Sequence, residues 1–189
     1  MTDIPDQVLI QRSQQGDREA VGQLYRRYAQ AIARYVTYRV PDDAAIEDIT
    51  AEVFLRMIEG LPQYRITGAP FEAWLYRIAA ARIGDYYRKQ ARCPEQALPD
   101  EIMDYLIPME LDVQQREELD TLRGAISQLS DEYQSILTLR FVERKSLAEV
   151  AEILNKSLHA VGSEQHRALK KLAEILGTEK GRYYLRGES

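Results

Sequence analysis

The chain has 189 residues, 45% hydrophobic and 29% charged, which is enough apolar material for a folded core and excludes a disordered protein. It has no run of about 18 apolar residues that could span a membrane, and its N-terminus lacks the basic and apolar parts of a secretory signal. The single cysteine, Cys93, excludes an internal disulfide, and His159 and His166 lie too far from it in sequence to form a usual zinc pattern. We expect a cytoplasmic protein with no membrane insertion, no metal and no cofactor.

The net charge of −5 argues against a nucleic-acid partner only until the charges are placed along the chain. Residues 1–92 carry a net +1, residues 119–176 a net 0 and residues 177–189 a net +1, so the stretch 93–118 holds −7. That stretch contains three prolines and shows no sustained apolar period, which is typical of a linker. We therefore predict a domain over 1–92, an acidic linker over 93–118, a second domain over 119–177 and a tail over 178–189.

Apolar residues at steps of three and four predict that the first domain is a bundle of helices. The expected helices cover about 8–15, 18–38 and 43–59, and a fourth begins near Pro70. Asp17 is a candidate N-cap because its carboxylate can accept hydrogen bonds from the first free N–H groups. In the third helix we expect Ile58 to face inward with its apolar neighbours, and Gly60 and Pro62 to end the helix.

The second domain is predicted to contain a helix-turn-helix. After helices near 119–126 and following Ser130, Ser146 and Glu149 form a capping-box pattern that opens a short helix. Ser157 can cap a last helix that reaches Leu176 and ends at Gly177. A short helix, a tight turn and a longer helix is the order found in DNA-binding helix-turn-helix units. The whole chain is thus expected to be all-α, with two small helical domains joined by the acidic linker.

The last helix presents two different faces at 100° per residue. Apolar residues, including Val161 and Leu172, gather on the side that must pack on the domain. The other side offers hydrogen-bonding groups and cations suited to base edges and phosphates: His159, Ser163, His166, Arg167 and Lys170. The alternative is an ordinary solvated helix face. The capped short helix that precedes it favours DNA binding.

With these motifs in view, the chain resembles a sigma factor of the sigma-70 family, in its extracytoplasmic-function group. Residues 47–56, EDITAEVFLR, and 71–79, FEAWLYRIA, resemble stretches of the family's region 2. The stretches LTLRF, SLAEVAEIL and HRALKKL resemble region 4 and follow in the expected order. The resemblance covers about residues 15–92 and 119–176.

The resemblance implies a promoter-specificity subunit of bacterial RNA polymerase that recognises −35 and −10 elements and helps to open DNA. Its partners would be the polymerase core, through the clamp helices of the largest subunit and the flap, promoter DNA, and an anti-sigma protein. Polar contacts to the core would come from the helix that carries Glu47, Asp48, Glu52 and Arg56.

For the −10 element, the resemblance implies that a separated strand is held by the helix of Trp74 and the loop before it. Cations would bind phosphates and planar groups would stack on unpaired bases. The candidates are Tyr64, Arg65, Arg77, Arg82, Tyr86 and Arg88. We expect Trp74 itself to be a core residue. Ala80 and Ala81 stand where the family usually has arginine and asparagine, and Gly162 stands where a cation is common.

Three other functions are alternatives to a sigma factor. A stand-alone helix-turn-helix regulator would bind a double-stranded palindrome without polymerase, as a dimer. A protein–protein regulator would retain the fold without opening DNA. An enzyme is not expected, because the sequence contains no glycine-rich phosphate loop, HExxH or GxSxG motif.

Overall fold

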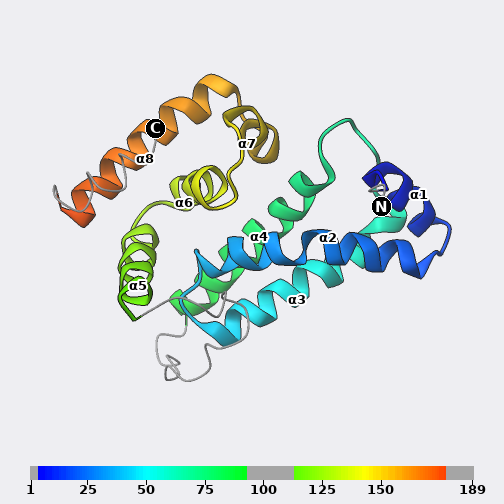
Figure 1. Cartoon of the computed structure of the whole chain (residues 1–189), viewed down its shortest axis with the longest axis horizontal. Coiled ribbons are helices and arrows are strands. Elements are labelled where there is room, and N and C mark those ends of the chain that lie inside the picture. Colours follow the sequence, from blue (N-terminus) through cyan, green and yellow to red (C-terminus); the bar gives the residue numbers. More distant parts are fainter. Residues whose placement is uncertain (1–3, 93–112, 178–189) are drawn as a thin grey trace.

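The computed structural model describes residues 4–92 and 113–177, with side chains described from residue 120 onward in the second stretch, and this part of the chain is helical throughout its regular structure (Figure 1). The predicted tail and most of the predicted linker lie outside the described residues. The first stretch contains α1 (Asp6–Gln14), α2 (Arg18–Thr37), α3 (Asp43–Gly60), the 3₁₀ turn η1 (Leu61–Gln63) and α4 (Phe71–Arg92). The second contains α5 (Val113–Ser127), α6 (Asp131–Leu137), the π-helical turn η2 (Thr138–Val142), α7 (Leu147–Leu154) and α8 (Leu158–Leu176).

In the first stretch, α2, α3 and α4 lie lengthwise against one another, and α1 packs at the end where α2 begins (Figure 1). The predicted N-cap is confirmed: the Asp17 carboxylate accepts from the N–H groups of Glu19 and Ala20, at 2.9 and 3.2 Å. Asp42 caps α3 in the same way. The bundle is therefore held by a shared apolar interior and by helix ends whose free N–H groups are satisfied.

In the second stretch, the predicted helix-turn-helix is confirmed. The Ser146 hydroxyl accepts from the Glu149 N–H at 3.2 Å, and the Glu149 carboxylate accepts from the Ser146 N–H at 2.7 Å. Asn155 takes the left-handed conformation that ends α7, and Ser157 caps α8. These local devices turn the chain sharply and fix the direction in which α8 leaves.

Two predictions about element limits and burial differ from the structure. Helix α5 begins at Val113, inside the stretch predicted as linker, because the segment 113–118 is rich in strong helix formers such as glutamine and glutamate. Ile58, expected inward, is 50% exposed, because its neighbour Met57 occupies the inward position of that turn.

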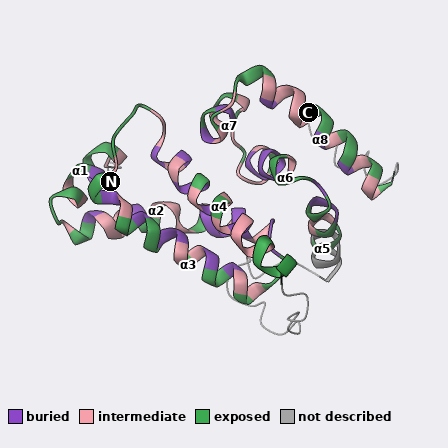
Figure 2. Ribbon diagram, turned by 180° about the vertical axis from the view of Figure 1, so that it is seen from behind, coloured by how far each residue is buried: buried purple, intermediate pink, exposed green. Residues whose placement is uncertain are grey.

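The two predicted domains do not stand apart. One apolar core contains residues of α2, α3 and α4 together with residues of α6, η2, α7 and α8, and buried positions mark α4, α6 and α7 (Figure 2). A smaller cluster holds α8 against α5 and α6 through Ile126, Leu137, Ala168 and Leu172. No helix within residues 4–92 and 113–177 is long and apolar enough to cross a membrane.

Candidate nucleic-acid interface

Helix α8 carries the first candidate surface. Val161, Ala168 and Leu172 are buried and fix which way the helix faces. The opposite side borders an open groove of about 960 Å³ between α7 and α8. Four of the five predicted residues line this groove, namely His159, Ser163, His166 and Arg167. Lys170, the fifth, is exposed one turn further along the same side of α8.

The groove also contains an apolar residue that the sequence analysis missed. Leu158, the first residue of α8, is 53% exposed and lines the groove beside Leu147 and Gly162. A helical projection places Leu158 at the border between the buried and exposed sides of α8. The helical period alone therefore does not predict whether Leu158 is buried or exposed. One feature of the sequence could have indicated that Leu158 is exposed. It directly follows the Ser157 cap, so it lies in the first turn of α8, before the part of the helix that packs on the domain.

An acidic residue on α8 is turned away from this groove. The Lys156 ammonium lies 2.8 and 2.9 Å from the two carboxylate oxygens of Glu164, and 3.1 Å from the Glu132 carboxylate. The hydrogen bond to Glu164 raises the pKa of Lys156, so the cation stays charged and the Glu164 charge is compensated. The groove face therefore presents donors and cations without an opposing carboxylate from α8.

The loop between α3 and α4 forms the second candidate surface. The Tyr64 ring packs against the rings of Trp74 and Phe71, with centroids 4.7 and 5.2 Å apart, and borders a hollow of about 510 Å³ together with Tyr28 and Ile66. Trp74 is partly buried in this aromatic cluster, as expected for a core residue. Its ring lies directly against Gly60, where an added Cβ would come within 2.8 Å of Cζ2.

The predicted −10 residues do not form one surface. Arg77 and Arg88 project about 20° apart on α4, whereas Arg82 and Tyr86 project to nearly the opposite side. Arg82 is held by ion pairs with Glu52 of α3, at 3.1 Å, and with Asp85, at 2.5 Å. The remaining member, Arg65, is exposed on the loop beside Tyr64.

The two sides of α4 differ in how exposed their candidate side chains are and in whether these already have partners. Arg77 and Arg88 are exposed, although Arg88 also pairs with Asp85. Burial raises the pKa of Tyr86 to about 12, so its hydroxyl stays protonated, and it accepts a hydrogen bond from Gln90 at 2.6 Å. A strand that touched Arg65 and Arg77 would meet exposed cations, although Arg77 Nε donates to the Ala73 carbonyl oxygen at 3.1 Å, whereas Arg82 is paired with carboxylates within the bundle.

Helix α3 forms the third candidate surface. Glu47 and Asp48 are exposed, and the Glu52 carboxylate lies 3.5 Å from the Arg56 guanidinium. Two apolar residues are exposed on the same helix: Leu55, at 54%, was not among the candidates, and Ile58, at 50%, was predicted to be buried. An apolar patch with a charged border is typical of a protein-binding surface.

Comparison with known proteins gives matches over both stretches. Residues 24–93 match the family model of sigma-70 region 2, and residues 119–172 match that of sigma-70 region 4. The chain is 32% identical over 176 residues to the ECF RNA polymerase sigma factor BldN of Streptomyces coelicolor, covering 89% of this chain and 64% of BldN. The chain therefore spans just under two thirds of that relative.

Two further proteins are matched over more of their own length. The chain is 30% identical over 177 residues to the ECF RNA polymerase sigma factor ShbA of Streptomyces griseus, covering 88% of this chain and 93% of ShbA. In fold it is similar to CnrH, solved in complex with the cytosolic domain of CnrY, with a TM-score of 0.69 at 23% identity, covering 92% of this chain and 98% of that one.

Proposed function

This chain belongs to the extracytoplasmic-function group of the sigma-70 family, whose members are promoter-specificity subunits of RNA polymerase, and we propose that its three candidate surfaces divide that work. The resemblance and the all-α fold inferred from the sequence are thereby confirmed. In this proposal α8 reads the −35 element, the loop 61–70 with α4 holds the melted −10 strand, and α3 binds the polymerase core.

The observation that carries the proposal is the groove on α8. Arg167 borders it on α8, whose first residues Leu158 and His159 are exposed, and its Nε donates to the Ser163 carbonyl oxygen at 3.3 Å, which holds the guanidinium along the helix. A guanidinium presented from a helix in the major groove can bind guanine with two hydrogen bonds, and such a pair contributes about 1–3 kcal/mol of discrimination. His159, Ser163 and His166 supply further groups for base edges or phosphates.

Leu158 adds an apolar contact to this reading surface. A thymine displays its 5-methyl group in the major groove, and apolar side chains recognise that group. We propose that exposed Leu158, which has Leu147 beside it in the groove, contacts a thymine methyl in the −35 element. This accounts for a large apolar residue at the start of a helix that otherwise presents polar groups.

Core binding is proposed for the exposed side of α3. Leu55 and Ile58 supply apolar area, and Glu47 and Asp48 supply charged groups at its edge. The proposal also places the chain in the cytoplasm, where polymerase and promoter DNA are found, and gives it an anti-sigma protein as a partner in keeping with its family. In this proposal the chain makes and breaks no covalent bonds. Its binding energy positions polymerase at the promoter and favours open DNA.

Run-off transcription with purified core polymerase tests the proposal. We expect the chain to bind core and to direct initiation from a promoter with paired −35 and −10 elements. Arg167→Ala should lose initiation and −35 discrimination but keep core binding, because Arg167 is remote from α3. Lys171→Ala is the matched control, since Lys171 is exposed on α8 but does not border the groove.

Two outcomes would replace the proposal with another function. Binding to a palindromic duplex without any affinity for core would indicate the stand-alone regulator. Core binding without initiation, across a broad promoter library, would indicate the protein–protein regulator. Equal loss of core binding and initiation in Arg167→Ala would show that the variant is misfolded or that α8 is not the reading element.

A further inference from the structure

A small hollow of about 250 Å³ lies where the turn between α2 and α3 faces α5. None of its residues borders the groove on α8, belongs to the loop 61–70 or is among those proposed for core binding. The hollow is therefore separate from the three candidate surfaces. The residues around it include Tyr38, Arg39 and Asp43 from the first domain and Asp120, Arg123 and Gly124 from the second.

The guanidinium of Arg123 is the most unusual group at this hollow. Its side chain is only 10% exposed, and Nη1 lies 3.6 Å from the carboxylate of Asp120, which is itself 65% exposed. The other two nitrogens, Nε and Nη2, are buried and have no hydrogen-bond partner in the part of the chain that the structure describes. A buried cation with unpaired donors is unfavourable, and an anion at those donors would offset the cost of its burial.

Another arginine of this chain shows what such a pair of nitrogens binds. Nε and Nη2 of Arg34 donate to the two carboxylate oxygens of Glu143, at 3.0 and 2.9 Å. These two nitrogens lie on one edge of the planar guanidinium, and their spacing matches the two oxygens of a single carboxylate. Arg123 has the same edge without a partner among the described residues. The group that fits this edge is therefore a carboxylate.

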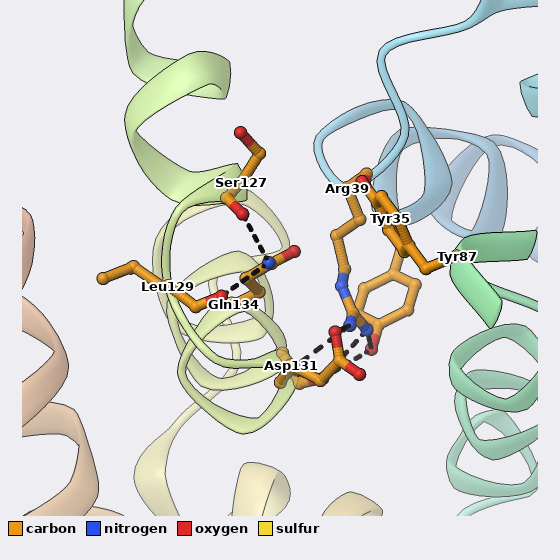
Figure 3. A network of polar contacts seen from close by, with 8 residues as sticks. Tyr35, Arg39, Tyr87, Ser127, Leu129, Asp131 and Gln134 are labelled. Atoms are coloured by element: carbon orange, nitrogen blue, oxygen red, sulfur yellow. Dashed lines mark hydrogen bonds and ion pairs between the residues drawn. The ribbon is translucent and has the colours of Figure 1, made fainter. Parts of the chain in front are cut away.

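Arg39 brings a second buried guanidinium to the hollow (Figure 3). Its Nη1 donates to the hydroxyls of Tyr35 and Ser135, at 2.7 and 2.9 Å, and its Nη2 to the Asp131 carbonyl oxygen at 3.4 Å. Its Nε has no partner within residues 4–92 and 120–177. Of the six buried side-chain nitrogen and oxygen atoms that lack a partner in those residues, three belong to Arg39 and Arg123. Unpaired donors are thus concentrated at this one hollow.

The acidic residues at the hollow limit the charge of a ligand. Asp43 and Asp120 balance the charges of Arg39 and Arg123, so the surroundings are neutral overall. A doubly charged phosphate would leave more uncompensated negative charge in a half-closed hollow than a singly charged carboxylate would. There is also room beside the guanidinium, because a Cβ added at Gly124 would meet no atom within 4 Å.

We propose that this hollow binds a small, singly charged carboxylic acid, whose two oxygens accept parallel hydrogen bonds from Nε and Nη2 of Arg123. Arg39 adds positive charge, and the ring of Tyr38, 5.8 Å from the Arg123 guanidinium, supports that group from one side. Because Nε and Nη2 are covered in the structure, binding includes a small rotation of the Arg123 side chain toward the hollow. The site adds a ligand to the proposed function and does not depend on it.

Titration of the full chain with acetate and with lactate tests the proposal, with chloride replaced at constant ionic strength. The readout is the position of the arginine Nε–H signals in proton–nitrogen correlation spectra of the labelled protein. We expect the Arg123 signal, identified by its absence in Arg123→Lys, to move and to saturate. A ligand with as few atoms as acetate binds at best with a Kd of about tens of micromolar, so the titration extends into the millimolar range.

Two variants separate the carboxylate site from general charge attraction. Arg123→Lys keeps the charge but loses the two-nitrogen edge, so lactate affinity, followed by calorimetry, should fall at least about tenfold. Gly124→Leu keeps Arg123 and places a side chain at the hollow, so the Arg123 signal should remain visible but no longer respond. Leucine is a better helix former than glycine, so lost binding with an undiminished melting temperature is not misfolding.

The matched control is Arg26→Lys, which changes an exposed arginine of α2 that pairs with Glu19 and should leave the affinity unchanged. Absence of a saturable response to both acids in the millimolar range would overturn the proposal. Equal affinity in all variants would also overturn it, because binding would then be non-specific. Tighter binding of inorganic phosphate than of either acid would refute the assigned ligand class. These measurements use no polymerase or promoter, so a failure of run-off initiation bears only on the proposed function.

Discussion

Gly60→Ala gives a direct test of the aromatic cluster that supports the loop 61–70. Gly60 has an ordinary right-handed helical conformation, φ −87° and ψ −21°, so an alanine meets no backbone strain there. The added methyl group, however, would lie 2.8 Å from Cζ2 and 3.1 Å from Cη2 of Trp74. Because Tyr64 and Phe71 pack against the same indole, the ring has little room to withdraw.

The magnitude follows from two opposing effects. Overpacking a fixed neighbour costs about 1–3 kcal/mol, whereas replacing a helical glycine by alanine stabilises by about 0.5–1 kcal/mol. We therefore expect Gly60→Ala to lower the free energy of unfolding by about 1–2 kcal/mol, since the steric effect exceeds the propensity effect. Gly22→Ala is the matched control within α2. Its nearest neighbour is the flexible Arg26 guanidinium at 3.5 Å, so only the stabilising effect should appear.

Urea unfolding of both variants, followed by the fluorescence of the single tryptophan, measures the difference. The expected order of stability is Gly22→Ala, then the unmodified chain, then Gly60→Ala. In the proposed function, Gly60→Ala should also reduce promoter opening more than core binding, because the displaced indole pushes Tyr64. If Gly60→Ala proves as stable as Gly22→Ala, then Trp74 is free to move and the cluster does not hold the loop rigidly.

Two further predictions concern the reading surface and the first helix cap. Burying one thymine methyl contributes about 0.8 kcal/mol, so replacing the contacted thymine by uracil should weaken −35 binding about fourfold; Leu158→Ala should remove this difference, and an undiminished thymine preference in Leu158→Ala would contradict the contact. Hydrogen bonds from the Arg12 side chain and the Ala20 N–H lower the pKa of Asp17, so its charge stabilises the fold above the ordinary aspartate pKa and ceases to do so as the pH falls through the lowered value. Asp17→Asn keeps the cap, so its melting temperature should lie below that of the unmodified chain at neutral pH and converge with it on acidification, whereas a pH-independent gap would exclude the charge effect.

The parts of the fold that sequence could predict are those that depend on near neighbours in the chain. Asp17, Ser146 and Ser157 cap helices because a side-chain oxygen and a free N–H lie two or three residues apart, and this spacing is visible in the sequence. The inward side of α8 follows from the helical period in the same way. The exposed side of α8 could therefore be predicted almost completely, apart from Leu158 at its border, whereas its role in DNA binding stays a prediction.

The parts that sequence could not predict depend on contacts between distant residues. Arg34 and Glu143 are 109 positions apart, and neither a period nor a motif relates them. For the same reason Arg82 was predicted as a free cation, although α3 brings Glu52 to within 3.1 Å of it. Packing between helices decides which arginines on α4 remain available to a nucleic acid. The pattern of residues along a single sequence does not show that packing.

Because Arg92 and Val113 are joined by residues 93–112 of the same chain, the two domains that share the apolar core meet more readily than separate polypeptides would. A short tether presents the second domain to the first at an effective concentration in the millimolar range. A contact with a millimolar dissociation constant between separate polypeptides would then hold the two domains together in about half of the intact molecules. The two domains expressed as individual proteins could fail to associate at ordinary working concentrations, although the same surfaces meet in the intact chain. Tether length, as well as the chemistry of the facing surfaces, thereby sets the fraction of molecules in which the two domains touch.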